Sequence, residues 1–300
     1  MSALYTEVAK LQVPMLDRIV ADTIIATDKF LGQLEIVPND SIQFEYNQYS
    51  TYNGNSGATS SFAAPDGIVT PSSASYTNTI QKLSFALESF NIPDSFQTPQ
   101  FAAEWGAKSK VIARTLGKAV FNAKSTDTNV NFSGLRQVVS GSVTDTGCTA
   151  NGSGSMDLQY LDTAIHNIKV GTPNCIVTSL QGLTYLKRAI RTAAATPAME
   201  LMQDNYGNKI LSYWGIPIYP SEWIGNGLSG VEENTGTSIY VMYNSPLDGV
   251  FAWTQWANFI LTKGPIPVPY SVANNYTIAC GLGLVAASPY AISRVYGITG

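Results

Sequence analysis

Charged residues are scarce in this chain of 300 residues. Asp, Glu, Lys and Arg make up 13% of the sequence, about half of the roughly 25% that is usual for soluble proteins. The formal net charge is −4 and the pI is about 5.0, whereas a dedicated nucleic-acid-binding protein is normally basic. The composition therefore argues against tight DNA recognition as the main task.

Cysteine and histidine are also rare. Cys148, Cys175 and Cys280 are the only cysteines, and their wide spacing defines neither a disulfide framework nor a zinc motif, so we expect synthesis in a reducing compartment. His166 is the only histidine, and a Ser-His-Asp triad would have to use it. It has no obvious set of ligands beside it, and we expect a surface or interface histidine.

Long apolar runs are missing as well. The best run, around residues 282–287, is broken by glycine and is far shorter than the roughly 18 residues that indicate a membrane span. The N-terminus MSALYTEVAKLQVPMLDRIV mixes charges into its apolar positions, unlike the core of a signal peptide. We therefore expect synthesis in the cytoplasm and no membrane contact.

The sequence contains little that points to catalysis. It has no Gly-x-Ser-x-Gly elbow, no phosphate-binding P-loop and no close pair of carboxylates among aromatics. Residues 225–230 match Gly-x-Gly-x-x-Gly, but the loop-like sequel places Glu232 and Glu233 where a phosphate would bind. We expect no enzyme: no catalytic residues, no metal and no cofactor.

Aromatic residues, by contrast, are abundant. The chain has 11 Phe, 5 Trp and 16 Tyr, and 45% of its residues are hydrophobic. Interfaces between subunits are depleted of Lys, Glu and Asp and enriched in aromatic residues. The composition therefore favours a chain that buries part of its outer surface against other subunits.

Alternating patterns predict a long hairpin. Polar and apolar residues alternate over 41–49 and again over 77–90, which is typical of strands. The segment 50–75 between them is rich in Ser, Thr, Asn, Gly, Ala and Pro, with Asp66 as its only charge. A two-stranded hairpin alone is marginally stable in water, so we expect this one either to be disordered or to lie on a partner.

The clearest helix is predicted over residues 98–124, with Thr98 as N-cap and Pro99 in the first turn. Its apolar face consists of Phe101, Trp105, Ile112, Leu116, Ala119 and Ala123. Lys110, Arg114 and Lys118 lie on the opposite side, and Lys124 is nearby. The sequence leaves two interpretations of this basic stripe open, a solvated helix face or a surface that contacts DNA phosphates.

The rest of the chain predicts an α/β region followed by a β-rich end. Helices are expected over 157–169 and after Ser179, with a strand at 175–178 between them. Residues 209–219 predict a strand, a turn and a second strand. Further strands are expected over 239–243, 250–253, 258–262, 277–287 and 291–296.

This order of elements resembles that of the HK97-type major capsid proteins of tailed phages. Local sequences match as well. Residues 131–135 (NFSGL) are similar to the Gly-Leu turn after the family's long helix, and 211–218 (LSYWGIPI) to a family strand. Residues 241–251 and 282–292 resemble its later strands. The resemblance covers nearly the whole chain.

The resemblance implies an α+β fold, the HK97-like capsid fold, in five segments. Residues 1–38 would be an N-terminal arm, and 39–90 an extended hairpin, the E-loop, with its flanking strands. Residues 91–132 would form the peripheral domain with its long spine helix, and 133–262 the axial α/β domain. Residues 263–300 would supply the closing strands of the peripheral domain.

It also implies a function: a subunit that self-assembles into hexamers and pentamers of an icosahedral phage head around double-stranded DNA, built in the host cytoplasm and present in the virion. The expected partners are copies of itself, a portal, a separate scaffolding or decoration protein, and DNA bound non-specifically. The lumen-facing candidates are Lys110, Arg114, Lys118 and Lys124. The E-loop candidates for contacts between subunits are Tyr52, Phe62, Ile68 and Val69.

One family feature is not expected here. Some relatives cross-link a lysine of the E-loop to a neighbour, but residues 50–75 contain no lysine, and Lys82 lies on the returning strand. Two other functions stay open. An encapsulin would have the same shell fold around an enzyme cargo, and a β-rich hydrolase or carbohydrate-binding protein would need a catalytic or glycan-binding set.

Overall fold

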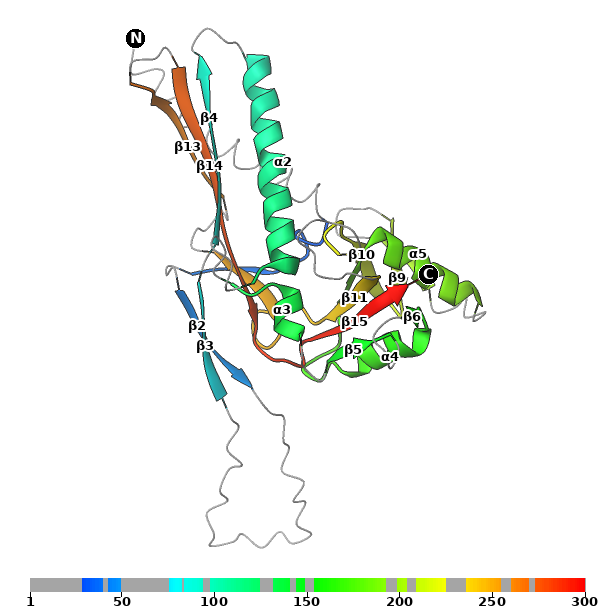
Figure 1. The fold of residues 1–300 in the computed structure, drawn as a ribbon. Coiled ribbons are helices and arrows are strands. Elements are labelled where there is room, and N and C mark those ends of the chain that lie inside the picture. The colour runs from blue at the N-terminus through cyan, green and yellow to red at the C-terminus, as the bar shows by residue number, and fades with distance from the viewer. Residues whose placement is uncertain are drawn as a thin grey trace, which may run out of the picture.

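In the computed structural model, the described residues are 29–299 apart from 40–42, 50–75, 83, 94–97, 125–131, 141–143, 149–153, 193–198, 204–208, 225–235, 255–259 and 270–272. They form a five-stranded sheet, an eight-stranded sheet and a separate two-stranded hairpin. Figure 1 shows the long helix α2 standing beside the long strands of the first sheet, with the shorter helices gathered around the second.

The predicted long helix is confirmed as α2 (Thr98–Asn122). It packs against β14 (Ala273–Ala286), which runs antiparallel between β4 (Ser84–Pro93) and β13 (Ile260–Pro267). The ring of Trp105 meets Tyr276 of β14 edge-on at 6.4 Å. The apolar face is buried as predicted at Trp105, Ile112, Leu116 and Ala123, and Ala119 is half-buried; the side chain of Phe101 lies outside the described part.

The last four residues of β14 extend the same sheet beyond the part that pairs with β4. They pair with β12 (Val250–Thr254), and β12 pairs in parallel with β1 (Ile36–Pro38). Gly283 lies opposite Trp253, whose side chain is fully buried. A Cβ added to Gly283 would meet the indole ring, so only glycine lets the two strands pair here.

The eight-stranded sheet forms the α/β part of the molecule. Its order is β5 (Asp145–Gly147), β15 (Ile292–Thr299), β11 (Thr237–Met242), β7 (Cys175–Thr178), β10 (Ile216–Pro220), β9 (Lys209–Tyr213) and β8 (Met199–Gln203), and β6 (Gly154–Ser155) also pairs with β15. The predicted strands at 175–178 and 209–219 are confirmed.

Two amphipathic helices pack on one face of this sheet. α4 (Leu158–His166) begins at Asp157, whose carboxylate accepts a hydrogen bond from the Gln159 amide. α5 (Leu180–Thr192) begins after Ser179, whose hydroxyl oxygen accepts one from the Gly182 amide at 2.9 Å. The cap at Ser179 is the one that the sequence predicts, whereas Asp157 was expected inside the helix and is its N-cap. Buried residues of both helices share an apolar cluster with Ile176, Ile218 and Ile239 of the sheet.

The largest apolar cluster joins both sheets. It contains the inner face of α2, the short helix α3 (Leu135–Val139) and the turn at residues 30–34. Phe121 lies 5.2 Å from Phe30 and 6.0 Å from Tyr240, ring centre to ring centre. Gly134, in the predicted Gly-Leu turn, donates its amide to the Ala123 carbonyl at 2.8 Å and packs directly on the end of α2.

One expectation needs correction. The single returning strand expected over 77–90 is two strands, β3 (Tyr76–Lys82) and β4, because β3 pairs within the hairpin whereas β4 joins the long sheet. β12 lies in the long sheet and β15 in the α/β sheet. Alternation predicts a strand but does not determine which sheet it joins.

Candidate functional site

The hairpin is the first candidate surface. β2 (Gln43–Tyr49) and β3 pair antiparallel from Gln43–Lys82 to Tyr49–Tyr76, and among the described residues they pair only with each other. Figure 1 shows this hairpin pointing away from the two larger sheets. The predicted contact residues Tyr52, Phe62, Ile68 and Val69 lie outside the described residues. Both outer edges of the hairpin carry backbone groups that another chain can pair with.

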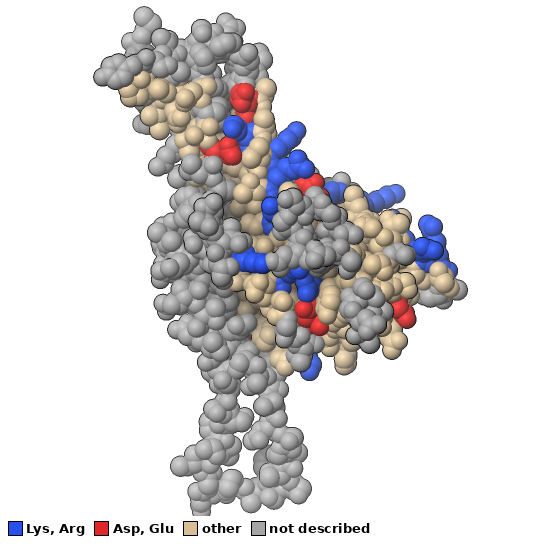
Figure 2. All heavy atoms as spheres, viewed as in Figure 1, with Lys and Arg blue, Asp and Glu red and all other residues tan. Residues whose placement is uncertain are grey.

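The basic stripe of α2 is the second. Lys110, Arg114 and Lys118 are all exposed, as the helical spacing predicts, and Lys124 is half-buried at the end of the helix. Figure 2 shows Lys and Arg side chains along α2 and around α5 on one face of the molecule. Cationic side chains aligned at four-residue spacing present a line of positive charge to whatever lies along the helix.

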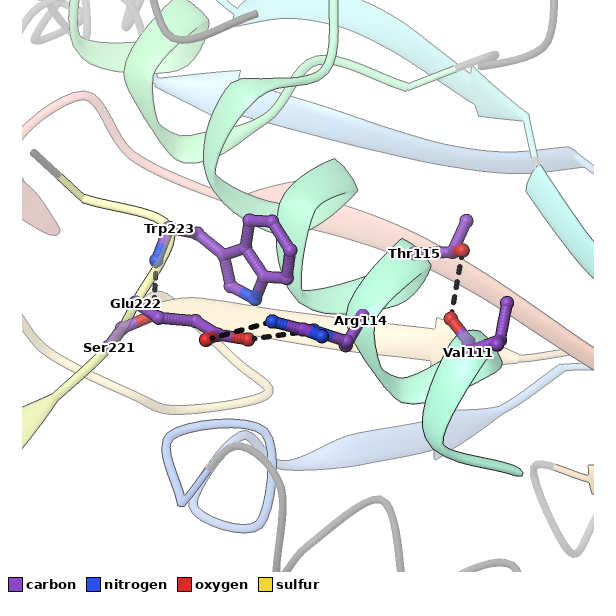
Figure 3. Close-up of polar contacts among 6 residues, drawn as sticks. All are labelled: Val111, Arg114, Thr115, Ser221, Glu222 and Trp223. Atoms are coloured by element: carbon purple, nitrogen blue, oxygen red, sulfur yellow. Dashed lines mark hydrogen bonds and ion pairs between the residues drawn. The ribbon is translucent and has the colours of Figure 1, made fainter. Parts of the chain in front are cut away.

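Arg114 differs from the two lysines because it has a carboxylate partner. Its Nε and Nη2 donate to Oε1 and Oε2 of Glu222 at 3.2 and 3.4 Å (Figure 3). Both side chains are about half exposed, so this pair contributes little to stability. It does neutralise the middle of the stripe, so the exposed positive charge resides on Lys110 and Lys118.

The turn after β10 fastens α2 to the α/β sheet. Glu222 and Trp223 follow β10 after Ser221, and Figure 3 shows the Trp223 indole turned toward the helix. Asn122, the last residue of α2, donates its side-chain amide to the Trp223 carbonyl at 3.0 Å. Nearer the middle of the helix, Lys108 forms an ion pair with Glu88 of β4 at 3.0 Å. Side-chain contacts thus join α2 to the α/β sheet at its C-terminal end and to β4 near its middle.

One ion pair is buried and structural. Nε and Nη2 of Arg294 on β15 donate to both carboxylate oxygens of Asp145 on β5, at 2.7 and 2.8 Å. Burial alone would lower the pKa of Arg294, but the hydrogen bonds and the charge of Asp145 more than offset it and raise that pKa. The pair fixes the edge strand β5 to the sheet.

No arrangement for catalysis is found among the described residues. His166 is the last residue of α4 and is exposed. In the part of the chain that the structure describes, no group of His, Cys, Asp and Glu could hold a metal ion. None of the described helices has the length and apolar character of a membrane span. The glycine-rich segment 225–230 lies outside the described ranges.

A polar cavity of about 340 Å³ lies where β7, β9 and β10 meet the turn before β1, with Cys175, Tyr219 and Asn244 in its lining. Burial raises the pKa of the Cys175 thiol well above its usual range, and a hydrogen bond with Asn244 offsets this only in part. A thiol held neutral in this way is a poor nucleophile. The cavity therefore has no evident chemistry of its own.

Comparison with known proteins supports the fold from an independent direction. Neither a protein-family model nor a curated protein matches the sequence. Solved structures do match over most of the chain. The SrpI encapsulin complex of Synechococcus elongatus PCC 7942 has a TM-score of 0.65 at 13% identity and covers 90% of this chain and 86% of its own.

A structure from Mycobacterium phage Bobi has a TM-score of 0.58 at 14% identity over 90% of both chains. The virus-like particle of Pyrococcus furiosus has a TM-score of 0.54 at 8% identity, covering 94% of this chain and 98% of its own. The chain has the HK97-like capsid fold. At these identities the likeness is one of fold, and the HK97-like fold extends over about 90% of the chain.

Two features within the HK97-like fold were not found from the sequence. Glu222 was not recognised as the partner of Arg114, because the two are 108 residues apart. Trp214, in the turn between β9 and β10, is 71% exposed, whereas the pattern over 209–219 predicted only strands and a turn. Its dihedral angles and its exposure are visible only in the structure.

Proposed function

We propose that this chain is the major capsid protein of a tailed phage, assembling into the hexamers and pentamers of an icosahedral head that encloses double-stranded DNA. The observation that carries the proposal is an HK97-like fold over about 90% of the chain, including a hairpin that pairs with no other described strand. A portal and a separate scaffolding or decoration protein would complete the particle.

Assembly would be driven by burial of apolar surface between copies. Removing such surface from water contributes on the order of 25 cal/mol per Å², before the entropic cost of association. Exposed Leu180 and Leu201 show that the described part leaves large apolar side chains uncovered. Because a subunit in a closed shell has several neighbours, modest contacts sum to a stable particle.

DNA would be held by charge, without sequence recognition. With Arg114 paired to Glu222, Lys110 and Lys118 are the described α2 cations that we assign to phosphate contacts, and Lys124 would extend the line. Such contacts release counterions, so retention of the genome weakens as salt rises. On this account α2 faces the lumen.

This role of α2 can be tested by neutralising the two lysines. We expect the K110Q/K118Q variant to form shells of normal size that package less DNA, since substitutions on an exposed helix face leave the core intact. The matched control is R114Q, which removes a charge already paired with Glu222. Packaged DNA is measured as nuclease-resistant length per particle. An unchanged length in K110Q/K118Q would refute the assignment.

The encapsulin function is a second candidate, favoured by the TM-score of 0.65 with the SrpI complex. The contents of the particles separate the two. Purified particles from the natural host context are treated with nuclease and then opened. Protected double-stranded DNA supports the phage head, whereas a stoichiometric second protein without DNA supports the nanocompartment. A chain that remains monomeric at all concentrations supports neither.

A further inference from the structure

Trp214 occupies a backbone conformation that a bulky residue rarely adopts. It has φ +49°, and Gly215 after it has φ +78°. This pair forms the two-residue turn between β9 and β10, a turn type in which Asn-Gly is strongly preferred. Among the described residues, Trp214 is the only non-glycine residue with positive φ. An asparagine would fit the turn with less strain.

The same side chain is also displayed to solvent. Trp214 is 71% exposed, and it is the only aromatic residue among the strongly exposed large hydrophobic residues of the described part. Tyr213 supports it: the two rings meet edge-on at 6.4 Å, and the buried Tyr213 hydroxyl donates to Asp162 of α4 at 2.8 Å. Leu201 of β8, which is 70% exposed, pairs with Leu211 on the strand beside it.

Strain and exposure are two independent costs in the isolated chain. A tryptophan at a position that is both strained and exposed is explained if a partner covers its side chain. Trp is enriched among the residues that dominate binding at interfaces. Tyr213 and Asp162 hold the base of the turn, so the indole is presented in a defined direction. Such pre-organisation favours association because less freedom is lost.

A pocket of suitable size and chemistry lies elsewhere on the same α/β unit. Its volume is about 470 Å³, and its lining includes Met156, Leu158, Tyr185 and Ala189 together with Asp157 and Arg188. This volume falls within the roughly 300–1,000 Å³ of pockets that enclose small organic ligands, so one indole fits. Arg188 offers a cation for the ring face, and the Asp157 carboxylate has acceptor capacity for the indole N–H.

Strand registers place the turn and the pocket at opposite ends of the sheet's strands. Because Ile218 pairs with Ile176 in parallel, the turn before Ile216 lies beyond the start of β7. Thr299, which lines the pocket, follows Ile298, and Ile298 lies opposite Thr237 at the other end. Figure 1 shows the C-terminus at that end, beside α5. Contact between two unlike surfaces on copies of one chain is head-to-tail, and it generates a ring when the rotation between copies closes.

We propose that Trp214 of one copy inserts into the pocket between α4 and α5 of the next copy. The occupant is a second copy of this chain, and the inference rests on the proposed function, because only an assembling chain repeats the contact. The exposed Leu201 would lie at the rim, and Arg188 would stack on the inserted indole.

The first test compares assembly with stability for the full chain. We expect W214N to unfold at the same temperature as the unmodified chain or higher, because Asn-Gly suits the turn, yet to need a protein concentration higher by on the order of tenfold or more before particles form in light scattering. The matched control is L247A, which removes another exposed side chain (82%) without backbone strain and should assemble normally. Normal assembly of W214N would overturn the proposal.

The second test reads the contact directly. The native cysteines are buried, so a bismaleimide reagent should link only introduced thiols. The double variant W214C/A189C should give a ladder of covalent oligomers, whereas a mixture of W214C with A189C should stop at dimers. Dimers from W214C alone would show a symmetric contact and overturn the head-to-tail arrangement. If the unmodified chain forms particles but no ladder appears, this inference fails alone; if it forms none, the proposed function fails with it.

Discussion

Single residues decide where elements of this fold can approach each other. A Cβ added at Gly134 would lie 2.8 Å from the Ala123 amide nitrogen and 2.9 Å from the Ala119 carbonyl oxygen. These are backbone atoms of the end of α2, which cannot move aside as a flexible side chain can. The Gly-Leu sequence is therefore a packing requirement, since only glycine lets α3 begin against α2.

Replacing Gly134 by alanine should lower the free energy of unfolding by about 1–3 kcal/mol, as over-packing does. Gly106, within α2, is the matched control, because nothing lies within 4 Å of its added Cβ. G106A should raise the free energy of unfolding by about 0.5–1 kcal/mol through helix propensity. Urea unfolding followed by Trp fluorescence measures both. Equal effects of the two variants would contradict this explanation.

Loss of the Arg294–Asp145 ion pair should lower the free energy of unfolding by more than the substitution at Gly134 does. The side chains are only 7% and 9% exposed, so R294M leaves a carboxylate buried without its partner and should cost about 3–5 kcal/mol. The double variant R294M/D145L should recover at least half of that loss, since both charges are then gone. The double-mutant cycle is measured by urea unfolding. A double variant no more stable than R294M would show that Asp145 is not the cause.

Elements were predicted from the sequence where their own periodicity determines them. α2, α4, α5 and β7 follow from helical or short apolar patterns, and the cap of α5 at Ser179 was recognised as well. The break between β3 and β4 was missed, although the alternation shifts by one residue between Ile80 and Leu83, where the pairing partner changes from β2 to β14. The basic stripe was predicted, but its interruption by Glu222 was not, because that contact depends on the tertiary fold.

A deletion at the tip of the hairpin tests the role of the hairpin in assembly. Deleting residues 53–70 removes the tip without touching β2, β3 or the described core, so the chain should stay folded and soluble. It should elute as a monomer from a gel-filtration column, because the hairpin has lost its contact with a neighbour. Unchanged circular dichroism serves as the control for folding. Intact shells from this variant would contradict the role assigned to the hairpin.

For the whole molecule, the order of the elements along the chain indicates the fold more clearly than any local motif does. An arm, a hairpin, a long helix, an α/β unit and closing strands follow one another in the sequence, and this order identified the HK97-like fold that the structure then showed. The sequence did not predict how surfaces far apart in the chain are exposed. Trp214 and the residues of the pocket between α4 and α5 lie in ordinary strand and helix patterns. Only the three-dimensional arrangement shows that they are complementary.

The central claim is that this chain completes its fold on copies of itself. The most direct measurement is a cryo-electron microscopy map of the purified full-length protein after concentration. The account predicts closed, uniform shells in which the β2–β3 hairpin lies across the adjacent subunit. Particles that are always single compact chains, with the hairpin folded back onto its own body, would contradict it.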